Sequence, residues 1–324
     1  MSKKAKRIDL FNCDMPSFMM VMPTHSNSDE NNRNNSWCDQ SHSEEETTID
    51  GESAFGQWTD LYMFLNQNAL VTIMPSPANK EGLADHVYAA NSGILIGDTY
   101  VVSNFTSEPR TPETPVIEQF MKTMGCNVVV CPFKFEGEAD MKYVGKLNGK
   151  DTYFAGYGIR STKEAYEWMM KEFDINIIPI KMTDERCYHF DCLFFQLTCS
   201  SNLSSTKANV MCCTEIISNE DKEKIKKYCN IIHVPEKLAD YGVTNCVRCG
   251  SYILCASDFN DLDPEIDGEV YYTERDKNQF LEDAISEFGM EPVFVNLSEF
   301  AKAGAMLSCN ICHLNHFSYD VELV

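Results

Sequence analysis

The feature that most constrains the fold of this chain is a recurring order of two strands, one amphipathic helix and one further strand. Alternating or continuous apolar residues predict the strands, and apolar residues at helical spacing predict the helices. Five predicted helices follow one another at intervals of roughly 50–60 residues, which is the period of a repeated structural unit. They span residues 54–67, 113–124, 162–173, 219–228 and 277–289.

Short strands flank each of these helices. The strands that follow the helices span residues 70–75, 126–132, 175–180, 230–234 and 292–297. The segments that precede them are 17–23, the hairpins 93–103 and 141–156, the pair 190–197 and 208–213, and the pair 251–257 and 269–273. Glycine-containing turns in the two hairpins favour tight reversals of the chain.

Repeats of this size indicate modules packed around a common axis. Because each helix has one apolar face, we expect the helices to cover an inner set of short mixed sheets, which gives an α/β fold class. Residues 16–324 then form a single domain after an N-terminal tail, residues 1–15. Residues 26–53 are rich in Asn, Ser and Glu and are predicted to form a polar loop, either a surface insertion or a lid over a site.

The charge of the chain restricts its partners. The sequence has 27 basic and 49 acidic residues, a formal net charge of -22. Such a surface repels nucleic acid and anionic membranes and mildly attracts small cations. No apolar run approaches the roughly 20 residues that span a bilayer. The N-terminus has no secretory pattern, so we expect a cytoplasmic protein whose 15 cysteines are reduced thiols.

Two C-x-x-C patterns raise the question of a cofactor. Cys309, Cys312 and His313 spell C-x-x-C-H, the pattern of covalent haem attachment, and Cys246 with Cys249 supply a second C-x-x-C. Haem attachment normally follows export, so it is disfavoured by an N-terminal sequence that has no export signal. The gap between the two pairs is far longer than the roughly 15–20 residues of a compact zinc ribbon. We therefore expect no metal and no cofactor, and we interpret Cys246, Cys249 and Cys312 as buried small hydrophobic residues.

Several polar motifs lie at the ends of the predicted strands, where catalytic groups are common. They are DHVYAANSG (85–93), FEGEAD (135–140), GYGIRST (156–162), RCYHFD (186–191) and SEFAKAGAMLSC (298–309). Together they resemble the motifs of the guanidino-group-modifying (pentein) superfamily, which includes arginine deiminases, amidinotransferases, dimethylargininases and arginine dihydrolases. The resemblance covers nearly the whole chain and implies a five-bladed α/β-propeller of ββαβ modules.

The resemblance also implies roles for individual residues. Catalytic roles fall on Cys309 as the nucleophile, His189 as the acid and base, and Asp140 and Asp191 as carboxylates that hold the guanidinium group. Substrate-binding roles fall on Asp85, Asn91, Arg110, Glu136, Arg160 and Asn35; Asn35 lies in a stretch, NNSWCD, that resembles a loop of the dihydrolases.

These residue types fit the chemistry that the resemblance implies. A guanidinium carbon is a poor electrophile, so a thiolate is the appropriate nucleophile, and a nearby cation favours the thiolate form. Carboxylates hold a planar guanidinium by charge-assisted hydrogen bonds. We expect a hydrolase of arginine or a methylated arginine that is similar to dimethylargininases and releases citrulline and an amine through an S-amidino intermediate. Arginine dihydrolase, amidinotransferase and a non-catalytic binding protein remain alternatives.

The chain departs from the superfamily's pattern near the nucleophile. Ala305 stands where relatives have a second glycine, and Ser308 stands where relatives often have a basic residue. Ile159 replaces a glutamate of the arginine deiminases, which favours the dimethylargininase and dihydrolase branches. Sheet edges between the modules would support a homo-oligomer, whose partner is a second copy of this chain.

Overall fold

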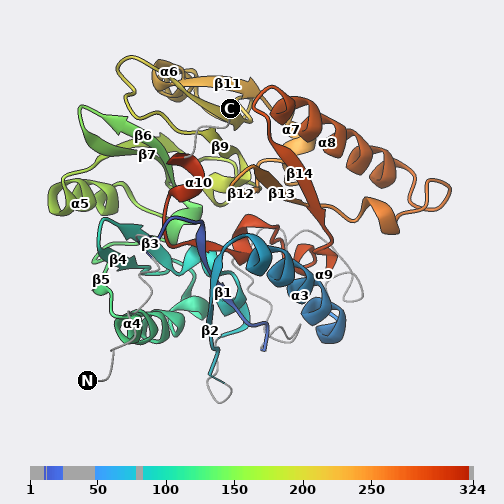
Figure 1. Cartoon of the computed structure of the whole chain (residues 1–324), viewed down its shortest axis with the longest axis horizontal. Helices are drawn as coiled ribbons and strands as arrows, with labels where there is room; N and C mark the ends of the chain where they lie inside the picture. Colours follow the sequence, from blue (N-terminus) through green and yellow to red (C-terminus); the bar gives the residue numbers. More distant parts are fainter. Residues whose placement is uncertain (1–10, 12, 25–47, 78–82, 321–324) are drawn as a thin grey trace, which may run out of the picture.

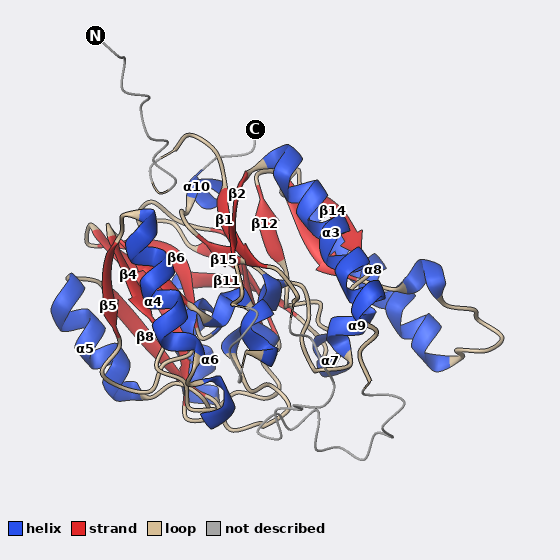
Figure 2. Cartoon of the chain, turned by 90° about the horizontal axis from the view of Figure 1, so that it is seen from below, coloured by secondary structure: helices blue, strands red, loops and turns tan. Residues whose placement is uncertain are grey.

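The computed structural model describes residues 11, 13–24, 48–77 and 83–320. In this part of the chain the strands form five three-stranded sheets. In each sheet the middle strand pairs antiparallel with one neighbour and parallel with the other. Figure 1 shows the long helices at the periphery of these sheets, and Figure 2 shows them outside the strands from a second direction. The predicted five-bladed ββαβ propeller is therefore confirmed.

The first two blades contain β1 (Ser17–Val21), β2 (Leu70–Met74) and β15 (Cys312–His313), then β3 (Gly93–Ile96), β4 (Thr99–Val102) and β5 (Asn127–Val130). The next two contain β6 (Met141–Leu147), β7 (Lys150–Tyr157) and β8 (Asn176–Lys181), then β9 (Phe194–Thr198), β10 (Ala208–Cys212) and β11 (Cys229–His233). The fifth contains β12 (Val247–Cys249), β13 (Tyr252–Ala256) and β14 (Glu291–Val295).

The long helices of the blades are α3 (Gly51–Asn68), α4 (Glu113–Met124), α5 (Lys163–Phe173), α6 (Asn219–Tyr228) and α8 (Glu269–Ser286). Shorter helices are α7 (Glu236–Asp240), α9 (Ser298–Ala301) and α10 (Phe317–Asp320). Helix α4 has the predicted bounds and ends at Gly125, whose φ of 90° is readily adopted only by glycine. The other helices of the first four blades lie within a few residues of their predicted positions.

The predicted loop 26–53 lies mainly outside the described residues, as does Asn35. Its last residues, 51–53, instead form the first turn of α3. Asp50 caps this helix, since its side chain accepts a hydrogen bond from the backbone N–H of Ser53 at 2.8 Å. The predicted loop boundary at residue 53 is therefore wrong by one helical turn.

The fifth blade differs from its prediction at one strand. Residues 269–273 are not a strand but the first turns of α8. Their β-branched and aromatic side chains suit a strand locally, but Thr273 continues a buried helical stripe with Lys277, Leu281 and Ile285. The missing strand is β12, which forms a hairpin with β13 around Gly250. One of the two C-x-x-C patterns therefore ends in a hairpin turn.

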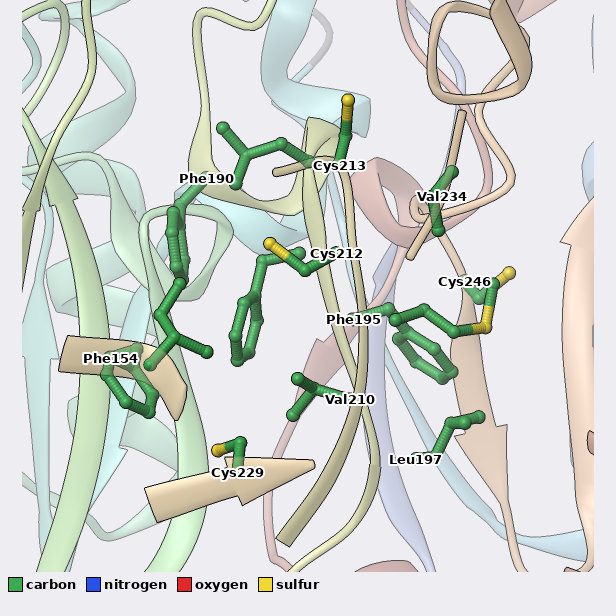
Figure 3. Close-up of a cluster of buried hydrophobic side chains, with 14 of the residues drawn as sticks. Phe154, Phe190, Phe195, Leu197, Val210, Cys212, Cys213, Cys229, Val234 and Cys246 are labelled. Atoms are coloured by element: carbon green, nitrogen blue, oxygen red, sulfur yellow. The ribbon is translucent and has the colours of Figure 1, made fainter. Parts of the chain in front are cut away.

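The largest buried cluster joins the third, fourth and fifth blades and includes several cysteines. Figure 3 shows Phe154, Phe195 and Val210 in it, with Cys212 and Cys246 as neighbours. Cys246, Cys249 and Cys312 are each no more than 3% exposed, which confirms that they are buried. In the described part of the chain, no helix combines the length and the apolar character needed to cross a membrane.

A C-terminal strand closes the ring of blades. In β15, Cys312 and His313 pair antiparallel with Met19 and Phe18 of β1, so the last strand completes the first blade. Glu138 holds this strand from another blade: its Oε1 lies 2.8 Å from His313 Nδ1, and its Oε2 accepts the backbone N–H of His313 at 2.9 Å. Burial opposes the charge of Glu138, but the charge and hydrogen bonds of His313 outweigh it and lower the pKa of Glu138. The pair therefore ties β15 to segment 135–140.

We predict that Glu138→Ala lowers the free energy of unfolding by about 3 kcal/mol, because it leaves the partly buried His313 without its charged partner. Denaturant unfolding measures this change. Glu118→Ala is the matched control: Glu118 forms an ion pair with Lys122 on the surface of α4, and its loss should cost less than about 0.5 kcal/mol. Equal losses in the two variants would show that the Glu138–His313 pair does not stabilise the closure.

Candidate active site

Short 3₁₀ turns at the ends of the strands carry most of the predicted site residues. Asn91 ends the turn Ala89–Asn91, Asp191 lies in Phe190–Cys192, and Cys309 lies in Ser308–Asn310. The turn Gly137–Ala139 lies within the FEGEAD segment and touches the first of these. Gly137 has a φ of +74°, and an added Cβ would lie 2.3 Å from the carbonyl oxygen of Ala90. Glycine is thus required where segment 135–140 passes Asn91.

His189 and Glu136 form the central contact of the site. The Nε2 atom of His189 lies 2.8 Å from Glu136 Oε2, and both side chains are buried. The other oxygen of Glu136 accepts backbone N–H groups from Thr106 at 2.9 Å and Ser107 at 3.3 Å. Burial raises the pKa of Glu136, but the hydrogen bond with His189 and the charge of Arg160 outweigh it and lower that pKa well below its usual range.

Arg160 supports the same carboxylate. Its Nη1 lies 3.2 Å from Glu136 Oε2, and its guanidinium carbon lies 5.1 Å from the centre of the Tyr188 ring. The Tyr188 ring lies in turn 4.9 Å from the His189 ring, edge to face. Arg160 therefore lies close to His189, where its positive charge also favours anions.

Asn91 and Arg110 extend this network. Asn91 Nδ2 lies 3.4 Å from His189 Nε2 and 3.3 Å from the carbonyl oxygen of Glu136, and its Oδ1 accepts a hydrogen bond from Arg110 Nη1 at 2.8 Å. Arg110 also makes a two-point ion pair with Glu113, with both distances 2.8 Å. Its Nη2 donates to the backbone carbonyl of Asp85 at 2.9 Å. Arg110 therefore orients Asn91, and its predicted contact with a substrate carboxylate stays a prediction.

Asp140 has neutral hydrogen-bond donors on its two carboxylate oxygens. Ser161 Oγ donates to Oδ2 at 2.6 Å, and the backbone N–H of Phe190 donates to Oδ1 at 3.1 Å. Burial raises the pKa of Asp140 to about 6, and the charge of His189 opposes this shift only in part. A bound cation would reverse the shift. Asp140 is thus a carboxylate whose burial would be compensated by a positively charged ligand.

Cys309 lies beside Asn245 and opens on a cavity of about 290 Å³, which is also lined by Tyr188, Cys192 and Gly304. Burial, together with the charge of Asp191, raises the pKa of Cys309 to about 12. With this raised pKa, the sulfur of Cys309 is a thiol at neutral pH. A cationic substrate would favour the thiolate that attack requires.

Asp191 connects the Cys309 segment to the segment that contains His189. Ser308, the residue before Cys309, donates from its hydroxyl to Asp191 Oδ2 at 2.6 Å, and Lys142 Nζ lies 3.9 Å from the same oxygen. Only Phe190 separates Asp191 from His189 along the chain, and it is fully buried and stacks on Phe194 at 4.7 Å. The hydrogen bond from Ser308 to Asp191 thus brings the His189 and Cys309 segments together. Ser308, which stands where relatives often have a basic residue, therefore has Asp191 as its partner.

Most of the predicted site residues therefore lie in two connected groups. One group surrounds His189, and the other surrounds Cys309 and Asp191. Asp85 reaches the first through its backbone carbonyl, Asp140 lies next to it through Ser161 and Phe190, and Asn35 lies outside the described residues.

Sequence reasoning missed several contacts of this site. Asn245 contacts the sulfur of Cys309, Glu113 holds Arg110, and Lys142 lies beside Asp191. Glu113 could have been found from its spacing, because it follows Arg110 by three residues at the start of a predicted helix. Asn245 gave no such signal, because it lies 64 residues from Cys309 along the chain and belongs to none of the polar motifs.

The structure separates the cysteines of the two C-x-x-C patterns. Cys312 Sγ lies 3.3 Å from the Tyr100 hydroxyl, whereas Cys249 Sγ lies 3.9 Å from the carbonyl oxygen of Asn68. Among the described residues, no group of His, Cys, Asp and Glu side chains has the arrangement of a metal site. Cys309 instead lies in a site whose other contacts are the amide of Asn245 and, through Ser308, the carboxylate of Asp191.

Solved structures with the same fold come from guanidino-modifying enzymes. The fold is that of the guanidino-group-modifying (pentein) enzymes, as the motifs predict. The ternary complex of the cyanobacterial protein AgrE with ornithine and NAD+ superposes with a TM-score of 0.75 and 23% identity, covering 94% of this chain and 40% of that one. Dimethylargininase (DDAH) from Pseudomonas aeruginosa, in complex with citrulline, superposes with a TM-score of 0.65 and 16% identity, covering 92% and 99%.

Sequence comparison finds relatives that are named as hydrolases of arginine or dimethylarginine. The bifunctional arginine dihydrolase/ornithine cyclodeaminase AgrE of Nostoc sp. is 32% identical over 149 residues, which are 45% of this chain and 20% of the relative. The dimethylarginine dimethylaminohydrolase of Mycobacterium tuberculosis is 28% identical over 144 residues, 44% of this chain and 45% of the relative. The match to AgrE therefore spans only a fifth of that protein. No protein-family model matches the chain.

Proposed function

We propose that this chain is a cysteine hydrolase that cleaves a guanidino C–N bond of arginine or a methylated arginine. The observation that supports the proposal is the hydrogen bond from Ser308 to Asp191, which ties the residue before the buried thiol of Cys309 to a residue two positions after His189, a histidine held by Glu136. Residues 16–324 act as one catalytic domain in this proposal. The names of the curated relatives support the substrate class.

In the first step, the cationic guanidinium group is held by Asp140 and Asp191, and its charge favours the thiolate of Cys309, whose proton passes to His189. The thiolate attacks the guanidino carbon and forms a C–S bond. His189 then donates a proton to the departing nitrogen as the C–N bond breaks. This step requires a protonated His189 ring. The negative charge of Glu136 stabilises the positive charge of that ring.

In the second step, the neutral form of His189 accepts a proton from a water molecule that attacks the S-amidino carbon. The C–S bond breaks and the thiol is restored. Arginine and one water thus give citrulline and ammonia, and dimethylarginine gives citrulline and dimethylamine. A second round on citrulline, with another water, gives ornithine, ammonia and carbon dioxide.

Arginine dihydrolysis is the version that we propose first. Two cyanobacterial arginine dihydrolases are 32% and 31% identical to the matched segment, against 28% for the dimethylarginine hydrolase. Asn91 also supports it: its amide lies on His189, where it can orient the second leaving nitrogen or the second water. Dimethylarginine hydrolysis is the second candidate, and an amidinotransferase would need a second amine as acceptor.

We predict that incubation with arginine yields ornithine and ammonia, with citrulline as an intermediate. Arginine, mono- and dimethylarginine and agmatine are supplied separately, and the products are identified by mass spectrometry. Cys309→Ser should lower turnover of every substrate by at least about 10³-fold, the scale of losing a nucleophile. Citrulline with an alkylamine, formed only from methylated substrates, would transfer the assignment to dimethylargininase, and no turnover of any substrate would contradict the proposal.

The pKa of Asp140 predicts how substrate binding depends on pH. Its pKa of about 6 means that the carboxyl becomes neutral below that pH and no longer attracts a guanidinium group. The KM for arginine should therefore rise as pH falls below 6, by about tenfold per pH unit, and steady-state kinetics measure it. Asp140→Asn should raise KM at every pH and flatten the profile.

Asp151→Asn is the control for this pH dependence, because Asp151 forms a surface ion pair with Lys146. That variant should retain the wild-type profile. A wild-type KM that stays constant between pH 7 and 5 would show that Asp140 does not hold the substrate cation.

A further inference from the structure

Asn245 is held rigidly beside the nucleophile. It lies between α7 and β12, and its side chain is only 2% exposed. Its Oδ1 accepts the backbone N–H of Ser308 at 2.8 Å, and its own carbonyl oxygen approaches the same N–H at 3.3 Å. Within the side-chain amide only the oxygen can accept this N–H, so the 2.8 Å contact assigns Oδ1 to the atom that faces Ser308. Nδ2 therefore carries the two N–H donors of the side-chain amide.

Both ends of this amide contact the sulfur of Cys309. Nδ2 and Oδ1 each lie 3.7 Å from Sγ. A thiol can donate its proton to Oδ1, whereas a thiolate has no proton and accepts a hydrogen bond from Nδ2–H. The same side chain can thus follow the sulfur from its resting form to its reactive form without moving.

The charges around the sulfur of Cys309 do not by themselves stabilise a thiolate. Asp191 disfavours the thiolate, and Lys142 is close enough to Asp191, at 3.9 Å, to offset part of its charge. Tyr188 and Cys192 also lie near Cys309, and burial raises the pKa of each well above its ordinary value, so both are neutral at physiological pH. The N–H group of Asn245 is then a neutral donor in direct contact with the reacting atom.

We propose that Asn245 is a further catalytic residue, whose side-chain amide donates a hydrogen bond to the Cys309 thiolate during attack on the guanidino carbon. This inference deepens the proposed function and rests on it. The hydrogen bond to Ser308 fixes the donor relative to the backbone of the nucleophile. No atom of Asn245 is transferred: it stabilises the anion that forms when the thiol loses its proton.

The test is the rate at which iodoacetamide, a neutral reagent, alkylates Cys309 between pH 7 and 9, followed by peptide mass spectrometry. Asn245→Asp keeps an oxygen for Ser308 but replaces the donor by a negative charge. Alkylation at Cys309 should be at least tenfold slower than in the wild type at each pH. With arginine as substrate, kcat should fall more than KM rises, because the donor acts on the nucleophile and not on the bound guanidinium.

Asn209→Asp is the matched control, since Asn209 is a partly buried amide on β10 that contacts Thr198, and its alkylation rate should stay within twofold of the wild type. If Asn245→Asp fails to fold, Asn245→Ala takes its place, with an expected loss of at least threefold. A rate within twofold of the wild type in a folded Asn245 variant would overturn the inference. Because alkylation needs no guanidino substrate, this outcome is distinguishable from a failure of the proposed function, which appears as absent turnover.

Discussion

Burying a carboxylate costs free energy unless a cation or several donors compensate it, and the six residues of FEGEAD bury three. Glu136 meets His189 from the segment before β9, and Glu138 meets His313 in the closing strand β15. Asp140 has only neutral donors in the described structure. The compensation of the first two comes from distant parts of the chain, so this short segment fixes how three blades meet at the site.

This constraint relates the fold to the chemistry. Glu138 holds the strand that follows Cys309, and Glu136 holds His189. Segment 135–140 therefore contacts both His189 and the strand next to Cys309. The third carboxylate lacks a full positive partner, and its raised pKa of about 6 shows the cost of that deficit. A guanidinium ligand would supply the missing charge. The site therefore combines a rigid frame with an electrostatic deficit that suits a cationic substrate.

Much of this arrangement could be predicted from the sequence, because local patterns determine it. Helix α4 and the hairpins near Gly97 and Gly149 follow from periodicity and turn residues, and the polar motifs identified most of the residues that meet at the site. What failed depends on tertiary contacts. Residues 269–273 have strand propensity, but they form the start of α8, whose buried stripe begins at Thr273. The contact of Asn245 with Cys309 joins residues 64 positions apart, and neither spacing nor composition indicates it.

The central claim is that Cys309 forms a covalent bond to a guanidino carbon, with His189 needed to release it. The most direct measurement is peptide mass spectrometry of His189→Gly after incubation with arginine and after acid quenching, with acid-quenched wild type in parallel. Removing the base that activates water should let the S-amidino adduct accumulate on Cys309. We predict that adduct on Cys309 and its absence in Cys309→Ser. No adduct in either protein with arginine, methylated arginines or agmatine, or an adduct on another cysteine, would contradict it.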